Sequence, residues 1–133
     1  MDRYLFRGLR TDGEGWVYGY VLFSPYEVCI FNYREHPVYN YVYRQNEVIP
    51  ETVGQWTGLL DKNGVKIFEG DYNEDGYCIV WCERCIGYEC AQLDVPTYDI
   101  CIPCHRCDGN FFLYEVINDY EVIGNIHEGK DNA

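Results

Sequence analysis

The sequence lacks the segments that would place a protein in a membrane or direct it to export. No apolar run approaches the roughly 18 residues that a membrane-spanning helix needs. The first ten residues, MDRYLFRGLR, carry charges but no apolar core of a signal peptide. We therefore expect a soluble, cytoplasmic protein with no membrane partner.

Residues typical of catalytic sites are also scarce. The single serine, Ser24, precedes Pro25 and lies outside any nucleophile-elbow motif. No phosphate-binding loop or zinc-protease motif occurs, and the three histidines are scattered at His36, His105 and His127. The segment 71–76 (DYNEDG) resembles the first half of a calcium loop, but the twelfth position is Cys82 rather than glutamate. The sequence therefore predicts neither a calcium site nor an enzyme.

Positive charge is nearly missing from the second half of the chain. The net charge is −12; residues 1–66 contain 7 basic and 8 acidic residues, and residues 67–133 contain 3 basic and 14 acidic residues. Such a half repels a phosphate backbone, so nucleic-acid binding through a basic face is disfavoured. The excess of acidic residues is consistent with three roles: keeping the protein soluble, binding the basic surface of a partner, or mimicking nucleic acid.

Tyrosine is abundant, with 14 residues against 6 Phe and 3 Trp in a chain of 133. Tyr suits half-exposed strands, and no helical period is sustained over ten residues. Only Ile49–Val53 is expected to form a short helical turn. The sequence predicts an all-β fold, a small barrel or sandwich in a single domain, with open strand edges that make a homo-oligomer plausible. The expected strands are Trp16–Phe23, Glu27–Tyr33, Tyr39–Tyr43, Gln55–Leu60, Val65–Glu69, Tyr77–Trp81, Phe111–Val116 and Tyr120–Ile123.

Seven of the eight cysteines lie between Cys78 and Cys107. Two C-x-x-C motifs, Cys82–Cys85 and Cys104–Cys107, are separated by 18 residues, which is the spacing of a structural zinc site with four thiolate ligands. A cytoplasmic location disfavours disulfides. We therefore predict a structural zinc ion bound by Cys82, Cys85, Cys104 and Cys107, a closed shell with no position for a catalytic water.

Other assignments of the cysteine cluster stay open. Cys101 is three residues before Cys104 and is an alternative ligand, and Cys90 is close in the sequence. A two-zinc cluster that uses Cys101, Cys90 and His105 is a further possibility, as are reduced core cysteines or an oxidised set. Cys29, in an apolar run, is expected to be a small core residue.

Five blocks in order resemble the YopX family of bacteriophage and prophage proteins. They are Phe6–Arg10 (FRGLR), Trp16–Tyr20 (WVYGY), Ile49–Gly58 (IPETVGQWTG), Leu60–Asp71 (LDKNGVKIFEGD) and Tyr120–Ile126 (YEVIGNI). The resemblance implies a small, mostly β protein with an SH3-like C-terminal part that acts in the bacterial cytoplasm during infection or lysogeny. It implies no reaction. It also implies no zinc, so the zinc prediction depends on cysteine spacing alone.

Within the single domain we expect an N-terminal β region at 1–48, an SH3-like β region carrying the zinc-knuckle insertion at 49–127, and a flexible tail at 128–133. Three functions fit this organisation. The first is a non-enzymatic, zinc-stabilised module that binds a host or phage protein through a tyrosine-rich or acidic surface, in counter-defence or regulation. The second is an acidic mimic that occupies a nucleic-acid-binding protein. The third is a single-strand binder that uses arginines among aromatics, namely Arg3, Arg7, Arg10, Arg34 and Arg44.

The metal content of the purified protein tests the zinc prediction. We expect one zinc ion per chain, and an intact mass after chelation that shows all eight thiols reduced. Four thiolate ligands bind zinc tightly, so removal of the ion should also lower the unfolding temperature. A metal-free protein, or a mass lowered by disulfide formation, would contradict the assignment.

Overall fold

The computed structural model describes residues 5–82, 86–92 and 111–128. The chain divides into an N-terminal unit, residues 1–56 with 129–133, and a C-terminal unit, residues 57–128. The expected regions at 1–48 and 49–127 stay predictions, and the tail expected at 128–133 lies outside the described residues except for Glu128. None of the helices in the described part of the chain has the length and apolar character that a membrane crossing requires.

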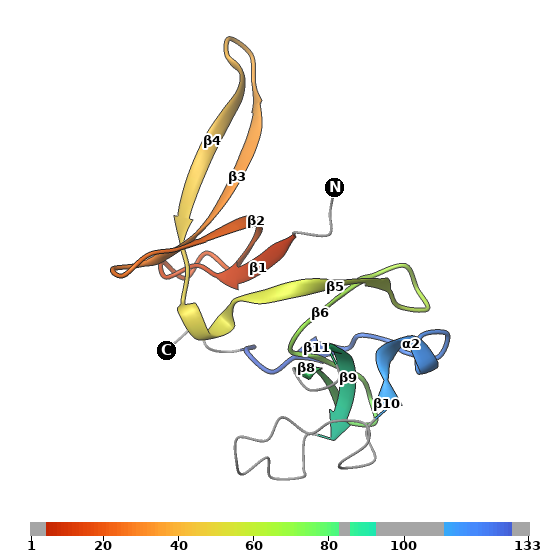
Figure 1. Cartoon of the computed structure of the whole chain (residues 1–133). Helices are drawn as coiled ribbons and strands as arrows, with labels where there is room; N and C mark the ends of the chain where they lie inside the picture. The colour runs from red at the N-terminus through yellow and green to blue at the C-terminus, as the bar shows by residue number, and fades with distance from the viewer. Residues whose placement is uncertain (1–4, 83–85, 93–110, 129–133) are drawn as a thin grey trace. The chain divides into compact units, whose positions relative to one another are not determined.

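The N-terminal unit is an antiparallel sheet whose strands follow the order β4-β3-β2-β1-β5. The strands β3 and β4 form a long hairpin (Figure 1). A 3-10 turn, η2 (Pro50–Thr52), lies where the sequence predicts a helical turn, and the Thr52 hydroxyl accepts the Leu9 N–H at 2.9 Å. The strands are β1 (Phe6–Leu9), β2 (Trp16–Phe23), β3 (Val28–His36), β4 (Asn40–Glu47) and β5 (Gly54–Leu60).

One face of this sheet forms the core of the N-terminal unit. Val17, Val28, Ile30 and Val48 are buried together, and Phe6, Val21 and Val53 pack against them. Strand alternation directs the other face of β2, β3 and β4 away from this core. The close approach of β2 and β3 requires Gly19, because a Cβ atom there would lie 2.1 Å from the carbonyl oxygen of Phe31.

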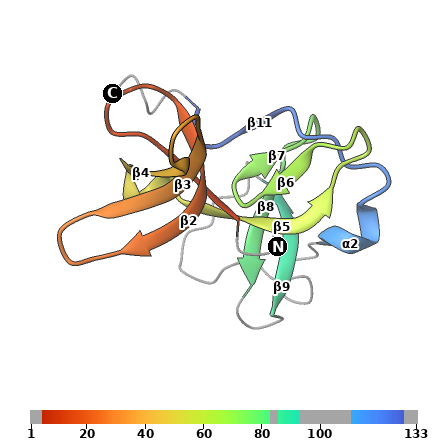
Figure 2. The same ribbon diagram turned by 90° about the horizontal axis from the view of Figure 1, so that it is seen from above.

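The C-terminal unit continues from β5, which is also hydrogen-bonded to β6 (Lys66–Phe68). A second antiparallel sheet has the order β10-β9-β8-β7-β11. Figure 2 shows β8 and β9 side by side, as their register requires. The core of the C-terminal unit consists of Ile67, Ile79, Cys90, Leu113 and Tyr120. The elements are β7 (Asp71–Tyr72), β8 (Tyr77–Cys82), β9 (Gly87–Gln92), β10 (Phe111–Phe112), α2 (Leu113–Val116) and β11 (Gly124–Asn125).

The prediction of a mainly β protein is confirmed, but two expected strands are wrong. The segment expected as a strand at 111–116 is a strand only at Phe111–Phe112 and then becomes α2, where the Glu115 carboxylate accepts the Phe112 N–H at 3.1 Å. The segment 120–123 is not a strand, because the Val122 N–H donates to the Asp61 carboxylate rather than to a strand partner.

The described strands form two antiparallel sheets and no closed barrel. The SH3-like likeness and the zinc knuckle therefore stay predictions at this point. Four strands that the sequence analysis did not predict, β1, β7, β9 and β11, complete the two sheets.

A buried aspartate organises the C-terminal unit. The Asp61 carboxylate accepts backbone N–H groups from Asn63 at 2.8 Å, Val65 at 2.9 Å and Val122 at 3.0 Å. The first two bonds close the β5–β6 turn, and the third ties a segment 61 residues away to it. Burial raises the pKa of Asp61, but the three hydrogen bonds, with a smaller contribution from the charge of Lys62, outweigh it, so the pKa lies below 3.8.

We expect Asp61→Asn to lower the free energy of unfolding at pH 7 by about 1–3 kcal/mol, because an amide cannot accept all three bonds. The ionised carboxylate contributes stability that is complete above its ordinary pKa of 3.8 and is lost as the pH falls through the lowered folded-state value. Denaturant melts at pH 7 and pH 2.5 should therefore show a smaller difference between variant and parent at the lower pH. The exposed Glu14→Gln serves as control, and a difference independent of pH would contradict the assignment.

Candidate functional site

Of the four predicted zinc ligands, only Cys82 lies among the residues that the structure describes. Cys82 ends β8 and pairs with Gly87 of β9. The other predicted ligands, and two of the alternative residues, lie outside the described residues: Cys85, Cys104, Cys107, Cys101 and His105. Among the residues that the structure describes, no group of three or more His, Cys, Asp or Glu could hold a metal ion. The zinc site therefore stays a prediction from spacing.

Three cysteines in the described segments are buried and form no disulfide: Cys29, Cys78 and Cys90. Cys29 is 2% exposed, which confirms it as a core residue. Burial, together with the charges of Cys78 and Glu89, raises the pKa of Cys90 to about 12. A thiol with this pKa is protonated at neutral pH and is a poor nucleophile.

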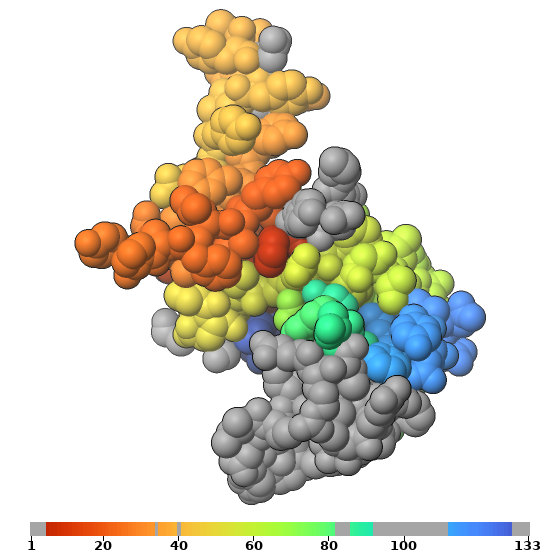
Figure 3. Space-filling model, in the orientation of Figure 1, coloured from red at the N-terminus to blue at the C-terminus, as the bar shows by residue number. Residues whose placement is uncertain are grey.

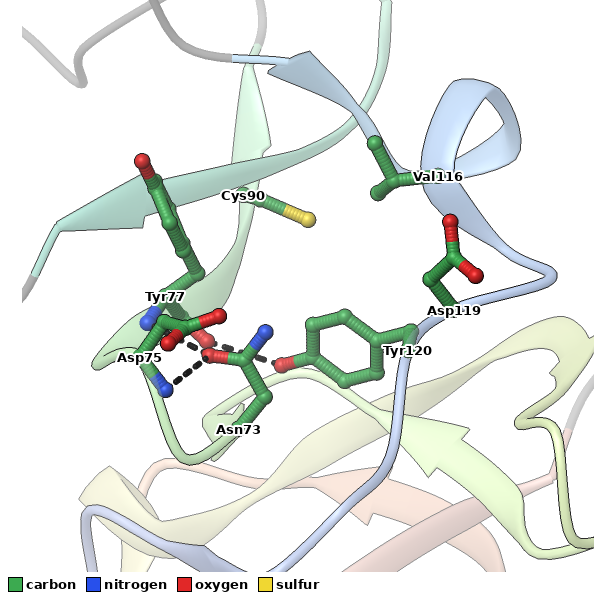
Figure 4. A pocket seen from close by; sticks show the side chains of 7 residues that line it. All are labelled: Asn73, Asp75, Tyr77, Cys90, Val116, Asp119 and Tyr120. Atoms are coloured by element: carbon green, nitrogen blue, oxygen red, sulfur yellow. Dashed lines mark hydrogen bonds between the residues drawn. The ribbon is translucent and has the colours of Figure 1, made fainter.

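A cavity of about 190 Å³ opens in the C-terminal unit (Figure 4). Its walls come from three separate segments: the turn between β7 and β8, the strand β9, and the chain around the end of α2. The lining residues are Asn73, Asp75, Tyr77, Cys90, Val116, Asp119 and Tyr120. The cavity thus combines carboxylates, aromatic rings and a buried thiol.

In the segment 71–76, which resembles a calcium loop in sequence, side-chain oxygens accept hydrogen bonds from the backbone. The Asp71 carboxylate is buried and accepts the Phe68 N–H at 2.8 Å. The Asn73 side-chain oxygen accepts the N–H groups of Asp75 at 3.2 Å and Tyr77 at 2.9 Å. These oxygens close a turn.

A second candidate site is the outer face of the N-terminal sheet. On β2, β3 and β4 this face carries six large apolar side chains that are between 46% and 75% exposed. We call this set the tyrosine face, and it consists of Tyr18, Tyr20, Leu22, Tyr33, Tyr41 and Tyr43. In the space-filling view the side chains of β3 and β4 stand open along the hairpin (Figure 3).

The tyrosine face contains a shallow hollow of about 300 Å³ lined by three rings. The Tyr33 ring meets the rings of Tyr41 and Tyr43 edge to face, with centroids 5.4 and 5.5 Å apart. Tyr33 and Tyr43 are directly paired across the two strands. Edge-to-face contacts are favourable, so the three rings stabilise one another in this arrangement.

Two of the arginines considered for nucleic-acid binding make contacts with other residues of the protein. Arg7 is 6% exposed, and its guanidinium carbon lies 4.6 Å from the centroid of the Trp16 ring. Arg10 forms an ion pair with Asp12 at 2.5 Å. These contacts reduce the positive charge available for phosphate.

The described residues thus define a small antiparallel β protein with two candidate sites, the tyrosine face and the cavity of the C-terminal unit. The comparison with protein families then identifies it more closely: the family model described as YopX protein matches residues 23–130. The chain belongs to the YopX family, which indicates a phage-type protein. The blocks at 6–10 and 16–20 lie before the matched residues. No curated protein and no solved structure gives a significant match.

A buried carboxylate that the sequence analysis did not single out lies at the centre of β9. Glu89 is 0% exposed and pairs with Val80 of β8 and Phe112 of β10. Neither of its carboxylate oxygens has a hydrogen-bond partner within the described part of the chain. A polar group buried in this way reduces stability.

We expect Glu89→Met to raise the free energy of unfolding by about 1–3 kcal/mol, because it replaces an unpartnered carboxylate with an apolar side chain of similar length. Urea unfolding at pH 7 measures the change, and the exposed Glu74→Met should leave the free energy nearly unchanged. A fall in stability together with a loss of bound zinc would contradict this prediction and would place Glu89 beside the metal.

Proposed function

We propose that this phage-type protein is a non-enzymatic binding module that recognises a host or phage protein in the bacterial cytoplasm through its tyrosine face. The observation that carries the proposal is the alignment of six exposed apolar side chains on one face of β2, β3 and β4. A contiguous exposed apolar patch on a small protein is typical of an interaction site.

The chemistry of the face supports a protein partner. Tyrosine is enriched in the cores of protein interfaces because its ring buries a large area while its hydroxyl stays able to hydrogen-bond. The hollow between Tyr33, Tyr41 and Tyr43 can receive one apolar side chain of the partner. Residues that fill such pockets commonly contribute most of the binding free energy.

The proposal includes a structural zinc ion and an SH3-like fold for the C-terminal part of the chain. The first C-x-x-C motif begins at Cys82, the last residue of β8, and the second, at 104–107, lies between β9 and β10 in the sequence. A zinc ion bound by both motifs would therefore join two connections between strands of one sheet. The role of this ion is structural, since four thiolates leave no open coordination position.

The acidic mimic is a second candidate, favoured by one observation. Residues 57–128 contain 14 acidic and 4 basic residues, a net charge of −10. A mimic would bind through charge, and its affinity would fall steeply with salt. Apolar binding through the tyrosine face is far less sensitive to salt.

The test compares capture of a partner from lysates of the bacterial host by tagged protein and by Tyr41→Ser/Tyr43→Ser. We expect the parent to retain one protein in near-equal molar amount at 0.5 M NaCl, identified by mass spectrometry. The double variant should retain at least about tenfold less, because a ring buried at the centre of an interface contributes 2 kcal/mol or more.

The matched control is Tyr26→Ser. Tyr26 is 95% exposed but lies in the turn between β2 and β3, outside the tyrosine face. This variant should retain the partner as well as the parent does. Equal loss in both variants, or loss of the partner from the parent at 0.5 M NaCl, would contradict recognition through the face. Size-exclusion chromatography with light scattering would show whether the partner is a second copy of the chain.

A further inference from the structure

The cavity of the C-terminal unit has walls that are held in place before any ligand arrives. The Tyr120 hydroxyl hydrogen-bonds to the backbone carbonyl of Tyr77 at 2.8 Å, and the Asn73 side chain fixes the turn that carries Asp75. Tyr120 is 2% exposed and belongs to the core cluster of this unit. A site with fixed walls binds at a lower entropic cost than one that must form on binding.

Negative charge lies on two sides of this cavity. Figure 4 shows the Asp75 carboxylate beside Tyr77 and the Asp119 carboxylate across the opening, below Val116. Both side chains are exposed, and no hydrogen bond or ion pair engages either carboxylate among the residues described. Among the described residues that line the cavity there is no lysine or arginine. A positive group placed between the two carboxylates would be attracted by both.

The interior of the cavity is less polar than its opening. The Cys90 sulfur points into it, the side chain is 2% exposed, and no hydrogen-bond partner engages it among the described residues. The Val116 methyl groups and the Tyr120 ring complete this wall. Burial keeps the thiol neutral, since the pKa of Cys90 is raised to about 12. The wall therefore suits an aliphatic chain, and its aromatic rings also attract cations.

We propose that this cavity binds a single organic cation on an aliphatic stem, a primary ammonium or a guanidinium, as presented by a lysine or arginine side chain of the protein partner. The volume of about 190 Å³ lies below the roughly 300–1,000 Å³ of pockets for larger ligands. It is matched to one side chain. The inference rests on the proposed function for the source of that side chain, but the cavity can be tested without the partner.

The test is a titration of the full-length protein followed by NMR, with small probes of defined chemistry. N-acetyl-lysine methylamide and N-acetyl-arginine methylamide represent side chains of a protein, and putrescine represents a free diamine. The neutral control probe is the same lysine compound acetylated at its Nζ. We expect saturable shifts at Tyr77, Asp119 and their neighbours with the cationic probes, weakening as salt is raised, and none with the neutral one.

The matched variants separate the two cavity carboxylates from general negative charge. Asp75→Asn/Asp119→Asn should weaken binding by about fivefold or more, which is the effect of two partly exposed charge pairs. Glu74→Gln removes a neighbouring exposed charge that does not line the cavity, and binding should change by less than about twofold. Because all three carboxylates are exposed, the variants should fold as the parent does, which their thermal melts verify.

The outcomes show whether the cation comes from a protein side chain or a free diamine, and whether the cavity binds a cation at all. Tighter binding of the lysine or arginine probe than of putrescine supports a protein side chain, and the reverse order contradicts that source. Equal binding of the neutral probe, an equal loss with Glu74→Gln, or shifts produced by calcium ions alone would overturn the cation site. None of these results depends on whether the tyrosine face captures a partner.

Discussion

The pleat of the N-terminal sheet, which sends alternate side chains to opposite faces, is the constraint on which both the core and the tyrosine face depend. Val17 and Ile30 are buried because they share one face, and the pairing of Tyr20 with Phe31 places aromatic rings on the other. A register slip of one residue would exchange the two faces and expose the core. The close approach at Gly19 opposes such a slip, since no larger residue fits beside the carbonyl oxygen of Phe31. The exposed tyrosines are therefore a consequence of the same register that buries the valines.

In the C-terminal unit, side chains replace strand pairing at several points. Asp61 binds the Val122 N–H, and the Tyr120 hydroxyl bonds to the Tyr77 carbonyl, so the segment after α2 is held without a long ladder. These contacts also make the cavity. Tyr120 lies in the core cluster and at the same time forms one wall, and the turn closed by Asn73 forms another. Packing and the candidate binding site are thus the same set of interactions, and weakening one alters the other.

The sequence predicted those elements whose structure is determined by residues close together in the chain. Strand β2 has the bounds that its run of aromatic and branched residues predicts, and η2 lies within the expected helical turn at 49–53. Helix α2 and the segment 120–123 could not be predicted in this way, because they depend on residues far away in the sequence. Leu113 of α2 is buried in the core of the C-terminal unit, and the Val122 N–H donates to the Asp61 carboxylate. Tyrosine abundance indicated recognition through a surface, but only the register shows which rings share a face. The cavity joins segments more than forty residues apart, so no motif indicates it.

The geometry of the described residues also supports the proposal that the protein acts by recognition. A covalent catalyst needs a nucleophile with a lowered pKa or an adjacent base. Burial moves Cys90 in the opposite direction, and the Tyr120 hydroxyl is committed to backbone carbonyls. The proposed contacts depend on the carboxylates of Asp75 and Asp119 and on the rings of the tyrosine face. A phage-type protein of this size can then present two separate surfaces, one apolar and one acidic. In the proposals made above, the partner of the first surface would bind mainly by burial and the partner of the second mainly by charge.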